Sequence, residues 1–520
     1  MPSTRSFEAP ESACAAPDDD IAREPIRGSG LLLVGKLLSL ALMCAVQILV
    51  TRHLSRSDYG AWTYALSVVT LLQSVAALGL DRSVTRFLAI YRERGDLARV
   101  RGLVLLLVGV VAGFGTLVTI VLVSFPTAIA SLTGVDAHVL ALLNVIIFLV
   151  PLEALDLLFI GLFACLGQAR AIVVRRHILS PSLKLAAVVV LVSLNADVTF
   201  LAYGYLAASL AGMLLYAPMV LRSARQLGLT GHRLRKREVT VPAKEVFAFT
   251  VPLLTADLAS AIIWTSGTLT LGYFSTLEQV ALFTVAASLA TLNETVARNF
   301  TVLYTPTISR LFARQDHAAI NTMYWRTAVW VAVLTFPVFV LTFSASGSIL
   351  HVLYGTKYHD AALVLSLLAF GEYVNVALGL NGLTLRLLSD VRYSVTVNIV
   401  AAIVGITANV VLVPRYGAIG AAFATSGTAI LHCILKQVGL ARATGVRPFE
   451  LRLSALYAGI TLGAVAVVVG QWIMPGRPSI LFALAAAASL LLLVASKRML
   501  MVTETFPEVM RVPLIRMLFA

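Results

Sequence analysis

Fourteen long apolar runs fill most of the sequence, and they limit the possible fold more than any other feature. A helix that crosses the hydrocarbon core of a bilayer needs about 20 mostly apolar residues. Runs of this kind lie at residues 30–50, 61–80, 102–124, 139–166, 178–194, 198–221, 246–272, 279–297, 327–344, 361–384, 393–412, 417–435, 453–473 and 479–495. Only 13% of the 520 residues are charged, against roughly 25% in soluble proteins. The sequence therefore predicts an all-α polytopic membrane protein with about 14 transmembrane helices.

Basic residues are distributed unevenly among the segments between these runs. With the N-terminus placed in the cytoplasm, 33 of the 40 lysines and arginines fall in inside segments and five in outside loops. The other two, Lys36 and Lys184, lie within apolar runs. Cytoplasmic loops of membrane proteins carry such an excess of basic residues. Because an error in the helix count would invert the alternation downstream, the pattern predicts that both termini are cytoplasmic.

A weak internal repeat divides the chain into two halves. Residues 59–96 (YGAWTYALS to RERGD) and 280–316 (VALFTVAAS to FARQD) share an apolar phase, the Ser67/Ser288 match and a closing basic segment that ends in Asp. Halves with an even number of helices are parallel repeats, related by a pseudo-two-fold axis along the membrane normal. The predicted segments are a disordered cytoplasmic leader (1–29), an N-lobe of six helices (30–221), a basic cytoplasmic linker (222–245), a C-lobe of six helices (246–435), two accessory helices (436–495) and a cytoplasmic tail (496–520).

Ionisable residues within the apolar runs are the candidates for function, because a charge at the centre of a membrane helix costs about 2.5–3.5 kcal/mol on insertion scales. The acidic candidates, which could carry coupling protons or Na⁺, are Glu153, Asp156, Asp257, Glu294 and Glu372. Simpler interpretations stay open for some residues. Lys36 is close enough to the cytoplasmic end to snorkel, and Glu294 and Arg298 are spaced to pair along their own helix.

Several other classes of protein are disfavoured. The segment from Gly30 to Lys36 imitates a phosphate-binding loop, but Leu37 replaces the Ser or Thr that would hold Mg²⁺ and no strand precedes it. The four cysteines have neither metal-ligand spacing nor a disulfide framework. The net charge of +14 is spread over short loops, unlike the clustered basic face of a nucleic-acid binder. The longest external loop, 345–360, is too small to carry a catalytic site, so we expect a carrier and not an enzyme, with no cofactor.

Four segments carry a resemblance to a known family. Residues 52–96 (RHLSRSDYGAWTYALSVVTLLQSVAALGLDRSVTRFLAIYRERGD) resemble the opening signature of the bacterial polysaccharide biosynthesis flippases, which belong to the multidrug/oligosaccharidyl-lipid/polysaccharide (MOP) exporter superfamily. Residues 412–428 (LVPRYGAIGAAFATSGT) are similar to that family's Pro-x-Tyr-Gly-x-x-Gly-Ala-Ala turn, and 353–373 and 242–254 also fit. The resemblance covers residues 30–440. One departure is that Trp264-Thr265-Ser266 stands where the family often has Trp-x-Asp, so either Asp257 or Glu294 takes any coupling role or the coupling differs from that of the family.

The resemblance implies two six-helix lobes of the MATE/MOP type around a cationic cavity in the bacterial cytoplasmic (inner) membrane. The implied cargo is an undecaprenyl-pyrophosphate-linked oligosaccharide for O-antigen, capsule or exopolysaccharide synthesis, moved by alternating access. Partners would be this lipid-linked substrate, membrane lipids and the polysaccharide polymerase or chain-length machinery, without nucleic acid. Basic groups would pair with the head group, and the candidates are Lys36, Arg82, Arg86, Lys184 and Arg298. The alternatives are a multidrug or toxin cation antiporter, a lipid II flippase and, remotely, a membrane polysaccharide polymerase.

Overall fold

In a computed structural model of the chain, the described residues are 19–125, 136–226, 239–388, 391–450, 453–473 and 478–500. The helices of the first half are α1 (Asp19–His53), α2 (Arg56–Ala77), α3 (Leu80–Ser83), η1 (Val84–Leu88), α4 (Ala89–Glu93), α5 (Leu97–Ser124), α7 (Ala137–Ile146), α8 (Leu149–Cys165), α9 (Ala169–Ile172), η2 (Val173–Leu179), α10 (Ser180–Ser193) and α11 (Val198–Gln226). Those of the second half are α12 (Ala243–Phe274), α13 (Leu277–Ala290), α14 (Leu292–Ala313), α15 (His317–Phe343), α16 (Ser346–Tyr354), η4 (Thr356–Ala361), α17 (Ala362–Ala377), α18 (Asn381–Leu388), α19 (Val391–Thr444), α20 (Ser454–Ile473), α21 (Pro478–Ala495) and α22 (Lys497–Leu500).

Twelve helical stretches within the described residues are long and apolar enough to cross a membrane. This confirms the predicted all-α, multi-span membrane protein. The predicted run 246–272 lies in α12, a 32-residue helix that is not among those twelve. The predicted runs 393–412 and 417–435 both lie in α19, on either side of the non-helical residue Gly417 (φ 54°, ψ −132°). The total of fourteen spans therefore stays a prediction.

Three predicted boundaries differ from the structure. Helix α1 begins at Asp19, so residues 19–29 of the predicted disordered leader are helical, while residues 1–18 lie outside the described residues. The predicted run 361–384 is divided, because Gly379 adopts a positive φ of 84° between α17 and α18. The predicted run 178–194 begins too late, because the π-helix η2 and α9 extend this span to residue 170 on its N-terminal side.

Equivalent aspartates end the two copies of the predicted repeat and have the same structural role. Asp96 accepts a hydrogen bond from the backbone N–H of Arg99 at 3.0 Å and caps α5, and Asp316 accepts one from Ala319 at 2.9 Å and caps α15. Each follows a residue with positive φ, Gly95 or Gln315. Such side-chain caps satisfy backbone donors that the first helical turn leaves unpaired. The two copies of the sequence repeat thus start corresponding helices in the same way.

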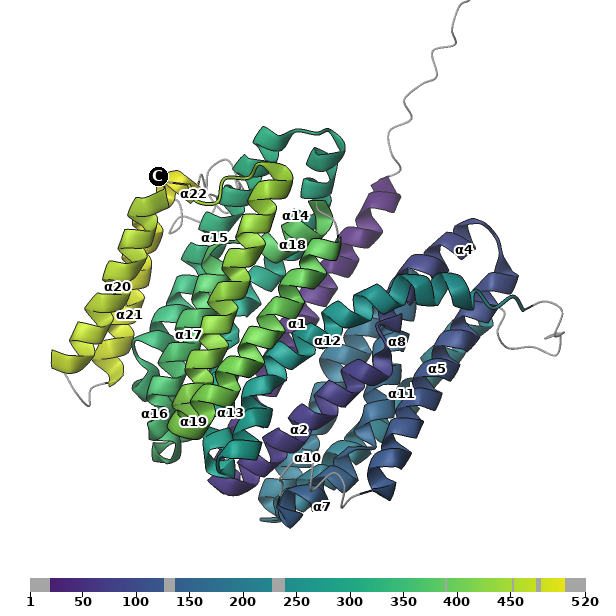
Figure 1. Ribbon diagram of the computed structural model, residues 1–520, viewed down its shortest axis with the longest axis horizontal. Helices are drawn as coiled ribbons and strands as arrows, with labels where there is room; N and C mark the ends of the chain where they lie inside the picture. The colour runs from purple at the N-terminus through teal and green to yellow at the C-terminus, as the bar shows by residue number, and fades with distance from the viewer. Residues whose placement is uncertain are drawn as a thin grey trace, which may run out of the picture.

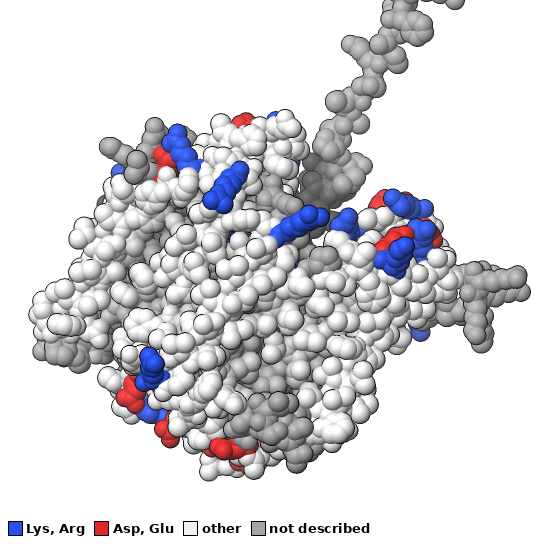
Figure 2. Space-filling model, viewed as in Figure 1, with Lys and Arg blue, Asp and Glu red and all other residues white. Residues whose placement is uncertain are grey.

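The helices form two groups that lie side by side (Figure 1). Helices α2 to α11 make one group and α13 to α19 the other, while α12 runs between them from the side of α4 to the side of α13. The last two long helices, α20 and α21, pair with each other and pack on α15 at the edge of the second group. On the face shown in Figure 2, charged side chains gather at the ends of the helices and leave a broad belt of other residues between them. Such a belt suits the hydrocarbon region of a bilayer.

The two groups meet along α2 and α13. Thr63 and Thr284, which are equivalent positions of the sequence repeat, share a hydrogen bond of 3.2 Å between their hydroxyls. Equivalent residues can touch in this way only close to a two-fold axis. Residues 52–58 and 345–361 lie at the end that the charge pattern predicts to be external, and we call it the outer end. The opposite end, with residues 80–101, is the inner end.

The outer end joins the two groups of helices through several polar contacts. The Arg52 guanidinium donates to the backbone carbonyls of Val352 and Leu353, both at 2.8 Å. Arg56 forms an ion pair with Asp360 at 3.0 Å. These contacts bring the end of α1 and the start of α2 against α16 and η4, so the structure is closed at its outer end.

Candidate functional site

Three cations from three different helices lie near one another within the membrane spans. Lys36 in α1 donates a hydrogen bond of 2.7 Å from Nζ to Oδ1 of Asn299 in α14. The positive charges of Arg298, also in α14, and of Arg176 in η2 act on the Lys36 ammonium. Arg298 pairs with Glu294 at 2.7 Å, as its i, i+4 spacing predicts. We call Lys36, Arg176 and Arg298 the cation cluster, and it draws on both groups of helices.

Arg82 and Asp257, two other predicted site residues, form an ion pair between α3 and α12. Nearby, the hydroxyls of Ser83 and Thr250 share a hydrogen bond of 2.6 Å. The Arg86 guanidinium lies 4.3 Å from the ring centroid of Phe249, so it packs on α12 as a cation–π contact. The inner half of α12 is therefore fastened to the first group of helices. The structure uses Arg82 and Arg86 for this attachment and does not bring them into the cation cluster.

Glu153, Asp156 and Lys184 line a polar pocket inside the first group of helices. Asp156 pairs with the buried Arg175 at 2.8 Å, and Glu153 pairs with Lys184 at 3.5 Å. The pocket has a cavity volume of about 320 Å³ and also contacts α2 and α11. We call it the Arg175 pocket. Glu153 and Asp156, three residues apart on α8, thus line the same pocket, and each acid is matched by a base from the following span.

Arg175 fits closely against Gly212 of α11, and this contact gives a prediction for stability. A Cβ atom at Gly212 would lie 2.6 Å from a terminal guanidinium nitrogen of Arg175. Because the contacted nitrogen is the end of a side chain that can shift, Gly212→Ala should lower the free energy of unfolding by about 1 kcal/mol, the lower end of the cost of overpacking. Gly109→Ala is the matched control, because nothing lies within 4 Å of its added Cβ and a helical Gly→Ala change stabilises by up to about 1 kcal/mol. Thermal unfolding of both variants in detergent measures this difference in stability, and equal melting temperatures would contradict the predicted loss in Gly212→Ala.

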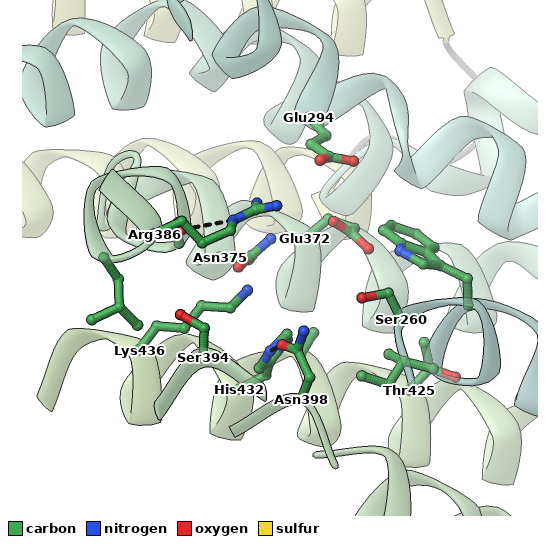
Figure 3. A pocket seen from close by; sticks show the side chains of 15 residues that line it. Ser260, Glu294, Glu372, Asn375, Arg386, Ser394, Asn398, Thr425, His432 and Lys436 are labelled. Atoms are coloured by element: carbon green, nitrogen blue, oxygen red, sulfur yellow. Dashed lines mark hydrogen bonds between the residues drawn. The ribbon is translucent and has the colours of Figure 1, made fainter. Parts of the chain in front are cut away.

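A second polar pocket lies in the other group of helices, among α12, α14, α17, α18 and α19. It has a cavity volume of about 220 Å³ and is lined by two predicted site residues, Glu294 and Glu372. Figure 3 shows the ends of Arg386, Asn375 and Lys436 close together, with Glu372 beside them. On the opposite wall, His432 and Asn398 share a hydrogen bond of 2.8 Å. We call this the Glu372 pocket.

Sequence reasoning missed several polar residues of these sites. The apolar runs were ended at the first charge, so the predicted loops contained Arg175, Arg176, Arg386 and Lys436. The i, i+4 spacing of His432 and Lys436 was an available signal for a polar helix face. Asn299 gave no signal, because only the tertiary fold brings it to Lys36. Among the described residues, no group of three or more His, Cys, Asp and Glu side chains could hold a metal ion.

Comparison with solved structures defines the class of the fold. The chain is similar to "Lipid II flippase MurJ, inward closed conformation" with a TM-score of 0.70 and 14% identity, over 91% of this chain and 99% of that one. It is similar to an inward-facing "multidrug resistance MATE family transporter of the MOP superfamily" with a TM-score of 0.65 and 13% identity, over 80% and 98%. It is also similar to the Vibrio cholerae MATE transporter VcmN in the bent form, with a TM-score of 0.54 and 14% identity, over 82% of this chain and 97% of that one. The chain therefore shares the fold of these MurJ and MATE structures.

Family comparison then identifies the family of the chain. Residues 26–312, more than half of the chain, match the family described as "Polysaccharide biosynthesis protein". The chain therefore belongs to this family. No curated protein sequence gave a significant match. The matched residues include the cation cluster and the Arg82–Asp257 pair, whereas most of the Glu372 pocket lies beyond residue 312.

Proposed function

We propose that the protein translocates undecaprenyl-pyrophosphate-linked oligosaccharide units across the bacterial inner membrane by alternating access. The product would serve the synthesis of a surface polysaccharide such as O-antigen, capsule or exopolysaccharide. In this proposal the cation cluster pairs with the pyrophosphate. The acidic groups Glu153, Asp156, Asp257, Glu294 and Glu372 are the places where a coupling proton or Na⁺ would act.

The cation cluster is the observation that carries this proposal. Lys36, Arg176 and Arg298 all lie in membrane-spanning helices, where charged side chains are costly and usually mark a substrate pathway. Arg298 is matched by Glu294, but Lys36 donates to the neutral amide of Asn299. The cluster therefore keeps excess positive charge within the span. A pyrophosphate diester carries two negative charges, which would be very costly to move through hydrocarbon without such pairing.

An exporter of cations would need excess negative charge, from unpaired acidic groups, at its binding site. In the described part of the chain, Asp257, Glu153 and Asp156 are each matched by a base, so these carboxylates do not form an open acidic site. This arrangement favours an anionic cargo over a cationic drug. A lipid II flippase would also carry a polyprenyl pyrophosphate, so the two flippases differ in the group attached to the pyrophosphate and not in the pyrophosphate that the cluster would bind.

Ligand-induced stabilisation of the purified protein tests the proposal. Undecaprenyl pyrophosphate should raise the melting temperature, because a ligand that binds only the folded state stabilises it by about 2.7 kcal/mol at a hundredfold excess over Kd. Undecaprenyl monophosphate should have a smaller effect and the cationic dye ethidium none. The gain with pyrophosphate should disappear in the Lys36→Gln/Arg298→Gln double variant. Stabilisation by ethidium without any effect of the pyrophosphate would contradict the proposal and favour the exporter.

A further inference from the structure

The Glu372 pocket has more cationic than anionic groups available to a ligand. Glu294 is already paired with Arg298. Lys436 forms no hydrogen bond or ion pair with a described residue, although the charges of Glu294 and Glu372 act on it from a greater distance. Arg386 donates from Nε to the backbone carbonyl of Gly382 at 3.1 Å, and no described carboxylate pairs with its guanidinium. The charges of Arg82 and Asp257, which pair with each other outside the pocket, also act on Arg386. Among the residues that line the pocket, two cations thus face one unpaired carboxylate, that of Glu372.

The other groups of the pocket have the chemistry of a carbohydrate site. The indole of Trp264 lines the pocket and is 50% exposed, so it offers an aromatic face on which the apolar C–H face of a sugar ring could pack. Asn375 and Asn398 provide amides, and Ser260, Ser394 and Thr425 provide hydroxyls. The Oε2 atom of Glu372 is buried without a described hydrogen-bond partner. Such an acceptor could receive a hydrogen bond from a sugar hydroxyl.

The pocket adjoins the cation cluster. Glu294 lines the pocket and its carboxylate pairs with Arg298 of the cluster at 2.7 Å. A sugar chain linked to a pyrophosphate in the cluster could therefore extend directly into the pocket.

We propose that the Glu372 pocket recognises a carboxylate-bearing sugar, such as a uronic acid, within the lipid-linked oligosaccharide. Lys436 and Arg386 pair with the sugar carboxylate, Trp264 packs on its ring, and Glu372 accepts hydrogen bonds from its hydroxyls. This inference rests on the proposed flippase function and gives the cargo a chemical class. A bound metal cation is the competing occupant, and the two nearby cations disfavour it by like-charge repulsion.

The test compares two synthetic cargoes that differ only in charge. Full-length protein in liposomes receives polyprenyl-pyrophosphate-linked disaccharides that end in either glucuronic acid or its neutral amide, glucuronamide. The wild type should move the acid at least about tenfold faster, because a hydrogen bond to a charged group contributes about 1.5–3 kcal/mol. Lys436→Gln should abolish the preference, so that the acid and the amide move at the same rate. The melting temperature of Lys436→Gln in detergent, compared with that of the wild type, shows whether the variant folds.

Two further variants complete the design. Lys436→Arg should keep the preference for the acid, because it keeps the charge. Arg442→Gln is the matched control, since Arg442 is an exposed base on the same helix, outside the pocket. Equal transport of acid and amide by the wild type would overturn the inference while leaving the flippase function intact. Transport of neither cargo would instead refute the proposed function, and a preference that survives in Lys436→Gln would remove Lys436 from the site.

Discussion

Replacing Lys36 with glutamine should lower the transport of a polyprenyl-pyrophosphate cargo by at least about 30-fold, because loss of one partner from a buried charge pair costs about 2–5 kcal/mol. Lys36 is the member of the cation cluster whose only described hydrogen bond is to a neutral group, the amide of Asn299. Its charge is therefore free to pair with the cargo. Initial rates of translocation in liposomes measure the effect.

Two controls separate this role of Lys36 from a role in folding. Lys36→Gln should unfold no earlier than the wild type, because it removes a charge that costs about 2.5–3.5 kcal/mol to place in a membrane helix. Lys244→Gln removes an exposed lysine at the start of α12 and should leave the transport rate unchanged. A Lys36→Gln variant that transports at the wild-type rate would show that the cluster does not bind the cargo.

Gly60→Ala should open the outer end of the protein. A Cβ atom at Gly60 would lie 1.8 Å from the backbone carbonyl oxygen of Leu277, and backbone cannot rotate away as a side chain can. The start of α13 and helix α2 would have to separate. Overpacking of this kind costs about 1–3 kcal/mol, which shifts a two-state equilibrium by about 5- to 150-fold. A transporter that alternates between two states should then work poorly, because the outward-closed state is depleted.

Distance measurements between spin labels check this result. Labels at Ser57→Cys and His359→Cys, two exposed positions at the outer end, are introduced after the native cysteines are replaced by alanine. The Gly60→Ala variant should show a longer distance than the wild type. Gly113→Ala is the matched control, because nothing lies within 4 Å of its added Cβ. Identical distance distributions in all three proteins would contradict the inference that the packing of α2 against α13 keeps the outer end closed.

Much of the fold could be predicted because the bilayer imposes local rules on the sequence. Each apolar run must be helical, since unpaired backbone groups are too costly in hydrocarbon. The repeat was visible for a similar reason, because Asp96 and Asp316 cap corresponding helices through their own side chains. The start of the fifth span was misplaced, because the π-helix η2 carries Arg175 and Arg176 inside the span, where a hydropathy count ends the run.

The candidate site was only partly predictable, because its pairs join residues far apart in sequence. The Glu294–Arg298 pair follows from helical spacing alone. Lys36 and Asn299 are 263 residues apart, and Arg82 and Asp257 are 175 apart. No local sequence pattern shows that Arg82 forms an ion pair with an acidic residue whereas Lys36 bonds to a neutral amide. The distinction between structural and available charges therefore required the tertiary fold.

Translocation in liposomes tests the central claim most directly. Purified wild-type protein is reconstituted with a fluorescent undecaprenyl-pyrophosphate-linked oligosaccharide, and the fraction accessible from outside is followed under proton and Na⁺ gradients. The account predicts protein-dependent movement of the lipid-linked sugar that is lost in Lys36→Gln and retained in Lys244→Gln. No movement above protein-free liposomes under either gradient, by protein that remains folded, would contradict it.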